Sequence, residues 1–177
     1  MTHDDELLRL LETARADDAA RSRAGVGALR DLIGEDATLQ GILVDLADDG
    51  RRVRLSVGSE TVTGIASRVC TGGVELIGHG TRALVRLAAI DAISTVGRSR
   101  LDGDGRTVPV GSWGALLHGS IERGDDLRLC ARGTGRRGTV VSIGPDVVVL
   151  DTADGSTTYA RTDSIDVVVV ASTTTSG

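Results

Sequence analysis

The stretch that decides the fold occurs twice in this chain. It reads VRLSVGSETVTGIASRVCTGGVELIGHGTRALVRLAAIDAISTV over residues 53–96 and LRLCARGTGRRGTVVSIGPDVVVLDTADGSTTYARTDSIDVVVV over residues 127–170. Matching residues lie 74 positions apart up to Leu76 and 75 apart from Gly80 onward, so one residue has been inserted between them. Insertions are tolerated in exposed turns, so this shift predicts the tip of a hairpin. A unit of this size used twice predicts two small domains in 177 residues.

The composition predicts an aliphatic core built from strands. Hydrophobic residues make up 40% of the chain, but there is no Phe, one Trp and one Tyr. The core must therefore be filled by Val, Leu, Ile and Ala, which suits β-strands. All basic residues are Arg, a bias typical of a GC-rich genome.

Charge is unevenly distributed along the chain. The net charge is −5, but residues 1–50 hold five Arg against twelve acids, whereas residues 51–101 hold eight Arg against three acids. The whole chain is not basic in the way that nucleic-acid binders commonly are. The first repeat alone has the charge to present a positive face.

Hydrophobic periodicity predicts helices over residues 4–23, 38–47 and 112–117, with Ser112 as the N-cap of the last. Val53, Leu55 and Val57 alternate with polar residues, which predicts a strand. Five short strands per repeat with turns between them are typical of a small barrel. The further expected strands are 60–70, 73–77, 82–87 and one after a turn at 89–93, then 127–132, 138–143, 147–151, 156–161 and 166–170.

The predicted fold is therefore mainly β with N-terminal α-structure, comprising two tandem five-stranded barrels preceded by helices. The expected division is a helical segment over 1–36, a first barrel with its leading helix over 37–96, a linker over 97–111, a second barrel over 112–170 and a flexible tail over 171–177. The acidic start lacks an apolar run, and no stretch is long enough to cross a bilayer, so a cytoplasmic protein without membrane contact is expected.

The signature of the repeat is an apolar-x-Leu strand, a Gly about nine residues later, and an Arg followed four residues on by Ile. Arg86 with Ile90, and Arg161 with Ile165, carry the last part. This pattern resembles the Sm-like (LSm) fold, a bent five-stranded SH3-like barrel behind an N-terminal helix. The helix-barrel-linker-barrel arrangement also resembles a group of actinobacterial two-barrel proteins. Other small barrels, including spore-coat and PRC-type modules, share the strand pattern.

The sequence departs from the family pattern at two places. Leu87 and Thr162 stand where the second family motif has Gly. Val57 and Arg132 stand before a Gly where the first motif has Asp or Asn, so that polar residue is missing.

The resemblance implies a nucleotide pocket, because in Sm-like proteins that bind RNA the motif arginine helps to form it. Here it points to Arg86 and Arg161. The alternative is that each Arg orders the neighbouring turn by bonding Asp91 or Asp166. Binders of single strands usually stack bases on aromatic rings, which are scarce here. Trp113 is expected to fill the core between helix and barrel; Tyr159 lies beside Arg161.

The stretch from Gly133 to Gly138 fits G-x-G-x-x-G. A dinucleotide site needs this loop to open a helix, but a strand-like run follows it, and the chain has no Lys for a kinase site. We interpret it as a hairpin between strands. Four Arg and no acid lie between Leu127 and Pro145, so a mobile Arg-Gly loop there would suit phosphate binding.

No catalytic or metal-ligating pattern stands out. Cys70 and Cys130 lack C-x-x-C spacing and are expected to be small core residues, and the three His are scattered. A non-enzymatic protein without a cofactor or metal is therefore expected.

Two functional hypotheses remain open. The first is a non-catalytic protein that binds the phosphate backbone of RNA or DNA through arginines of the barrel loops: Arg51, Arg52, Arg54, Arg86, Arg136, Arg137 and Arg161. The second is a scaffold or adaptor that binds another protein through a barrel edge strand or the N-terminal helix.

The strand over 166–170 is apolar on both faces and must be covered or paired. Sm-like barrels pair edge to edge in rings, and three chains would complete one here. We expect the simpler arrangement, in which the two barrels pack on each other and on the N-terminal helices, in a monomer or a homo-oligomer such as a dimer.

Overall fold

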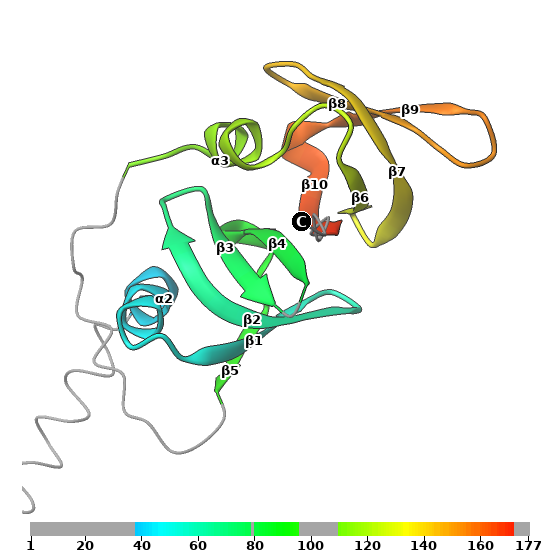
Figure 1. Ribbon diagram of the computed structural model, residues 1–177. Coiled ribbons are helices and arrows are strands. Elements are labelled where there is room, and N and C mark those ends of the chain that lie inside the picture. The colour runs from blue at the N-terminus through cyan, green and yellow to red at the C-terminus, as the bar shows by residue number, and fades with distance from the viewer. Residues whose placement is uncertain (1–37, 79, 96–109, 172–177) are drawn as a thin grey trace, which may run out of the picture.

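The computed structural model describes residues 38–78, 80–95 and 110–171, and in these ranges the protein is mainly β. Ten strands form one antiparallel sheet in the order β5-β1-β2-β3-β4-β10-β6-β7-β8-β9, with two α-helices beside it (Figure 1). The expected mainly β class is confirmed. The helix expected over 4–23, most of the linker and most of the tail lie outside the described residues.

The first repeat contains one helix, five strands and a single 3-10 turn. The side chain of Thr38 accepts a hydrogen bond from Gly41 N–H and so caps the helix, while Gly50 has a φ of +61° just after its end. These elements are α2 (Leu39–Asp48), β1 (Arg52–Val57), β2 (Glu60–Val69), β3 (Gly73–Gly78), β4 (Thr81–Arg86), the 3-10 turn Leu87–Ala89 and β5 (Ala92–Thr95).

The second repeat contains the same elements in the same order. Ser112 accepts a hydrogen bond from Ala115 N–H, as its expected capping role requires, and the helix runs three residues further than the sequence predicts. The elements are α3 (Trp113–Ser120), β6 (Asp126–Ala131), β7 (Thr134–Ile143), β8 (Val147–Asp151), β9 (Thr157–Arg161), the 3-10 turn Thr162–Ser164 and β10 (Ile165–Ala171).

The duplication seen in the sequence is also seen in the strand pairing. In each half of the sheet the strands follow the same order: the fifth strand of the repeat lies next to the first, and the second, third and fourth strands follow. The difference of one residue in length falls between β3 and β4 in the first repeat and between β8 and β9 in the second. Both of these strand pairs are hairpins, as predicted. A register shift interrupts β2 between Ala66 and Arg68, and β7 between Val140 and Ser142, at equivalent places.

The two repeats join edge to edge through β4 and β10. Val168 of β10 pairs with Leu84 of β4 on one side and with Leu129 of β6 on the other, so the apolar last strand is paired along both edges as its sequence requires. Figure 1 shows β4, β10 and β6 side by side where the repeats meet. Among the described strands the ladder is continuous and ends at β5 and β9.

Two buried clusters form the core, and each includes residues of both repeats. Cys130 and Val167 of the second repeat lie in the cluster of the first, and Cys70 and Leu84 of the first repeat lie in the cluster of the second. Both cysteines are free and buried, as expected. Full burial of a side chain of the size of Leu84 contributes roughly 1.5–3 kcal/mol to the stability of the fold. The boundary formed by β4 and β10, which we name the joint, is therefore part of the core.

The hairpin expected at the G-x-G-x-x-G stretch is shorter than predicted. Only Arg132 and Gly133 form the turn, with φ of +48° and +78°, and β7 begins at Thr134, four residues before the expected strand. Two consecutive residues with positive φ match the twist of the flanking strands and make a tight turn. The expectation of a mobile Arg-Gly loop is therefore wrong, because Arg136 and Arg137 are in a strand paired with β6.

Gly64 and Gly138 occupy the same place in the two repeats and bring two backbones together. A Cβ on Gly138 would lie 2.5 Å from the carbonyl oxygen of Asp151, and one on Gly64 2.8 Å from that of Ile77. We expect Gly138→Ala to lower the free energy of unfolding by about 1–3 kcal/mol, since the strands must move apart. Urea denaturation measures this.

Gly114→Ala is the matched control for that substitution. Gly114 lies in the first turn of α3, and its Cβ would have no neighbour closer than 3.9 Å. Alanine is the better helix former by about 1 kcal/mol. The control should therefore raise the urea midpoint, and a Gly138→Ala protein of unchanged midpoint would contradict the role given to Gly138.

Candidate functional site

Arg86 makes two polar contacts across the boundary between the repeats. Its Nη2 donates to Asp166 Oδ1 over 2.6 Å and its Nη1 donates to the carbonyl oxygen of Asp163 over 2.6 Å. The other carboxylate oxygen of Asp166 accepts from Arg132 N–H over 2.7 Å. Both side chains are largely shielded, at 27% exposure for Arg86 and 14% for Asp166, so the ion pair is poorly screened by water.

A structural role for the motif arginines was expected to consist of ordering the neighbouring turn by bonding Asp91 or Asp166. Arg86 bonds Asp166, but Asp166 belongs to the other repeat, so this contact joins the two repeats and does not order the neighbouring turn. The guanidinium of Arg86 is thus held within the protein. We name Arg86, Asp166 and the carbonyl of Asp163 the joint clamp.

Arg161, the counterpart of Arg86, lies in a different environment. It is at the end of the edge strand β9, its side chain is 76% exposed, and it pairs with Asp163, itself 61% exposed, over 2.6 Å. Exposed pairs of this kind contribute little stability, about 0–1 kcal/mol. Arg161 is therefore available for other contacts.

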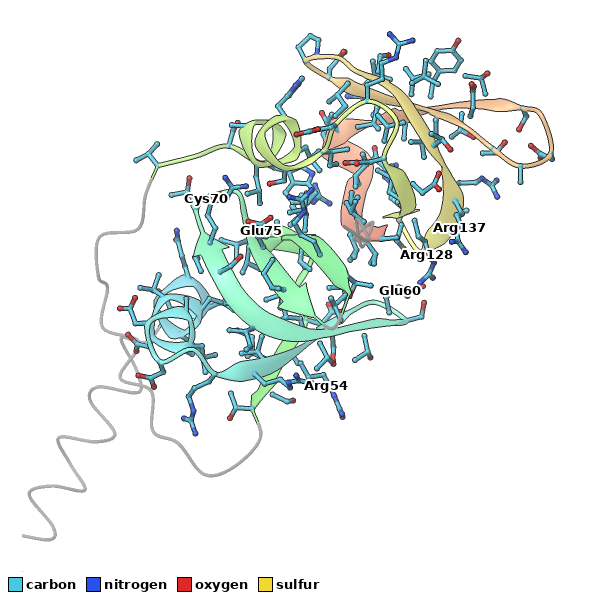
Figure 2. The ribbon with its side chains drawn as sticks, viewed as in Figure 1. Arg54, Glu60, Cys70, Glu75, Arg128 and Arg137 are labelled. Atoms are coloured by element: carbon cyan, nitrogen blue, oxygen red, sulfur yellow. The ribbon has the colours of Figure 1, made fainter. Side chains whose placement is uncertain are left out.

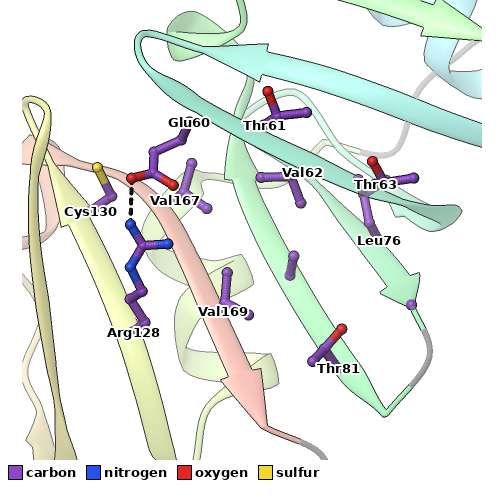
Figure 3. A pocket seen from close by; sticks show the side chains of 12 residues that line it. Glu60, Thr61, Val62, Thr63, Leu76, Thr81, Arg128, Cys130, Val167 and Val169 are labelled. Carbon is purple, nitrogen blue, oxygen red and sulfur yellow. Dashed lines mark hydrogen bonds and ion pairs between the residues drawn. The ribbon is translucent and has the colours of Figure 1, made fainter.

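A second ion pair across the joint was not predicted from the sequence. Arg128 of β6 donates to Glu60 of β2, and Figure 3 shows the two side chains reaching toward each other. No local signal identifies a partner 68 residues away; the only hint is that Glu60 is one of three acids in the basic stretch 51–101.

The Glu60–Arg128 pair borders a cavity of about 180 Å³ between β2, β4 and β10. Its walls include Val62, Leu76 and Val169, with Cys130 beside the ion pair (Figure 3). Burial raises the pKa of the Cys130 thiol, and the Glu60 carboxylate raises it further. The thiol therefore stays protonated near neutral pH and is a poor nucleophile.

The remaining arginines of the second repeat gather around β6 and β7. Arg137 lies opposite Arg128 in the strand register, and Arg132, Arg136 and Arg137 are all exposed. Figure 2 shows Arg128 and Arg137 close together beside Glu60. Glu60 neutralises Arg128, whereas Arg132, Arg136 and Arg137 have no ion-pair partner among the described residues. Arg136 and Arg137 are neighbours on β7, so their side chains point to opposite sides of the sheet. We name Arg132, Arg136 and Arg137 the arginine hairpin.

The arginines of the first repeat do not join this group. Arg52 and Arg54 are exposed on β1, and Figure 2 places Arg54 on a different part of the molecule from Arg128 and Arg137. Arg51 is half-buried, and its Nη1 is buried without a hydrogen-bond partner among the described residues. The structure thus separates the seven sequence-derived candidates into three groups: Arg51, Arg52 and Arg54; Arg136 and Arg137; and the two strand-end residues Arg86 and Arg161.

The two aromatic residues have opposite roles. Trp113 is 8% exposed, and its indole N–H donates to the carbonyl oxygen of Thr162 over 2.9 Å, which agrees with the expected core role. Tyr159 is 73% exposed on β9, two residues before Arg161. Its ring is exposed to solvent on the edge strand β9.

Within residues 38–78, 80–95 and 110–171, no group of three His, Cys, Asp or Glu could hold a metal ion. None of the helices in these ranges is long and apolar enough to span a bilayer. No protein-family model matches the chain, and no curated protein matches it.

The joint clamp gives a direct test. We expect Arg86→Gln to lower the free energy of unfolding by about 1.5–3 kcal/mol, because it leaves the shielded Asp166 carboxylate without its charged partner. Arg161→Gln is the matched control, and should change stability by less than about 1 kcal/mol.

Denaturant unfolding of Arg86→Gln, Asp166→Asn and the double variant completes a double-mutant cycle. The clamp predicts that the two substitutions are far from additive. Strict additivity, or an Arg161→Gln effect as large as that of Arg86→Gln, would show that the clamp does not hold the joint.

Proposed function

We propose that this is a non-catalytic binding protein whose arginine hairpin binds the phosphate backbone of RNA or DNA. We further propose that each repeat is a small SH3-like barrel of the Sm-like kind, so that the protein is a tandem pair. A cytoplasmic location fits the two buried cysteines, whose thiols are free.

The observation that carries the nucleic-acid proposal is the set of three exposed arginines on one hairpin. Arg132, Arg136 and Arg137 lie in a stretch with no acid between Leu127 and Pro145, and the cross-joint partner Glu60 neutralises only Arg128. Guanidinium groups form paired hydrogen bonds with phosphate oxygens, and an array on rigid strands needs little ordering on binding.

Of the seven arginines expected from the sequence, only Arg136 and Arg137 belong to the proposed site. Arg86 is omitted because the joint clamp holds it, and Arg51 because it is half-buried. Arg52 and Arg54 are omitted because they lie on β1, and Arg161 because it pairs with Asp163. With few aromatic rings for base stacking, binding rests on phosphate contacts. It is therefore expected to be weakly selective for sequence and strongly dependent on salt.

We expect full-length protein to bind duplex DNA or single-stranded RNA in a salt-dependent manner, measured by fluorescence anisotropy at several salt concentrations. The double variant Arg136→Gln/Arg137→Gln should lower the salt slope for duplex DNA by about two, since each phosphate contact releases about one counterion. Arg54→Gln, an exposed arginine on β1, is the control and should leave the slope unchanged. Lack of affinity for both polymers at low salt would refute the proposal.

A second candidate function is a scaffold that binds protein through a strand edge. It is favoured by the two unpaired ends of the described ladder, β5 and β9. An open edge presents a row of backbone N–H and C=O groups to another strand.

A further inference from the structure

Both repeats contribute walls to the cavity beside the Glu60–Arg128 pair. Val62 of the first repeat and Val167 of the second both line it, so the cavity exists only because the repeats are joined. Figure 3 shows the ion pair at one end of this space. We propose that the cavity is a binding site for a small carboxylic acid with a compact apolar body, whose carboxylate lies beside Arg128.

The interior of the cavity is apolar and incompletely filled. Val62, Leu76, Ala83 and Val167 line it, and all four belong to the buried cluster of the first repeat. Its volume of about 180 Å³ exceeds the roughly 150 Å³ of an apolar cavity that binds benzene. A six-membered ring or a short branched chain therefore fits, and it would restore the contacts that the walls lack.

The lining of the cavity is not a general property of the duplicated unit. The counterparts of Glu60 and Val62 in the second repeat are Thr134 and Arg136, and both are exposed. The counterpart of Ala83 is Thr158, which is half-buried. The combination of an apolar wall with a carboxylate at its end is therefore specific to the place where the first repeat faces β10 and β6.

The entrance to the cavity carries an excess of positive charge. Arg137 lies directly opposite Arg128 in the pairing of β7 with β6, so both side chains are on the face of the sheet that borders the cavity. Figure 2 shows both beside Glu60. Like charges at directly opposed positions repel each other, and Glu60 balances only one of the two. We name Glu60, Arg128 and Arg137 the cavity mouth.

A carboxylate matches the cavity mouth in both charge and shape. A guanidinium group can donate two parallel N–H groups to the two oxygens of one carboxylate. The side chain of Arg128 is 49% exposed, whereas that of Glu60 is 25% exposed, so a ligand can reach the arginine from solvent. A neutral ligand would leave the extra positive charge unbalanced, and a cationic ligand would be repelled by it.

Binding in this cavity is distinct from the nucleic-acid binding proposed above, although Arg137 takes part in both. Arg136 points to the opposite side of the sheet from Arg137, away from the cavity mouth. Phosphate binding by the arginine hairpin uses both residues, whereas binding in the cavity uses Arg137 alone. The two neighbouring arginines therefore separate one function from the other.

The test is isothermal titration calorimetry on full-length, nucleic-acid-free protein at low ionic strength, with four probes: benzoate, benzyl alcohol, benzylamine and acetate. We expect benzoate to bind saturably, with one site per chain. Benzyl alcohol keeps the ring but lacks the charge, and should bind about tenfold more weakly than benzoate. Acetate lacks the apolar body and benzylamine has the wrong charge, so both should bind more weakly still.

Variants of the cavity mouth should change benzoate affinity in opposite directions. Arg137→Gln should lower it about threefold or more, because it removes the unbalanced positive charge. Glu60→Gln should raise it, because it removes the carboxylate that competes for Arg128. Arg136→Gln is the matched control, with the same change of charge one residue away, and should leave benzoate affinity unchanged. Both arginine variants should weaken binding to duplex DNA, which is measured in parallel.

Ala83→Leu tests the cavity itself. Its side chain would occupy the space between Leu76 and Val169, which are the residues opposite Ala83 in the strand register. We expect this variant to lose benzoate binding while it keeps the affinity of the wild type for duplex DNA. If the larger side chain prevents folding, the opposite effects of Arg137→Gln and Glu60→Gln still decide the matter.

Four results would overturn the proposal. The first is a wild-type protein that does not bind benzoate at millimolar concentration. The second is benzylamine that binds as tightly as benzoate. The third is a benzoate affinity that Arg136→Gln lowers as much as Arg137→Gln does, or that Glu60→Gln lowers. The fourth is a folded Ala83→Leu protein that binds benzoate as the wild type does.

Discussion

The pairing of β4 with β10 is the interaction on which the rest of the structure depends. It joins two five-stranded halves into one sheet and lets each core cluster extend across the boundary, through Cys130 and Val167 in one direction and Leu84 in the other. The joint clamp fixes its register, because a guanidinium that donates to one carboxylate and one carbonyl has little freedom to slip along the strand. Without this ladder, β10 would present an apolar strand edge to water.

Much of the fold follows from local signals in the sequence. The alternation of Val53, Leu55 and Val57 predicts β1, and Ser112 predicts the start of α3, because these patterns act over a few residues. The one clear error in strand position, the start of β7, comes from the glycines around Arg136. Cross-strand pairing of Gly135 with Cys130 extends the strand through a segment whose own composition favours a loop.

The candidate site was less accessible to sequence reasoning because its contacts are non-local. Asp166 could be identified as a partner for a motif arginine, but not that Arg86 reaches it from the other repeat, 80 residues away. Glu60 gave no local signal at all. The duplication adds information that single residues do not give, because it identifies β4 and β9, and likewise β5 and β10, as equivalent strands. Once one pair of edges is seen joined, the chemistry of the other pair can be compared with it residue by residue.

That comparison explains why the two free edges differ from the joined ones in composition. At the joint β4 presents Ala83, Leu84 and Val85, all buried, whereas the corresponding residues of β9 are Thr158, Tyr159 and Ala160. An edge of Leu and Val exposed on a free chain would pair with any available strand. Threonine and tyrosine lower that risk, because their hydroxyl groups remain compatible with water while the ring still offers area to bury. The internal joint tolerates apolar residues because its two edges are covalently linked and do not meet other strands first.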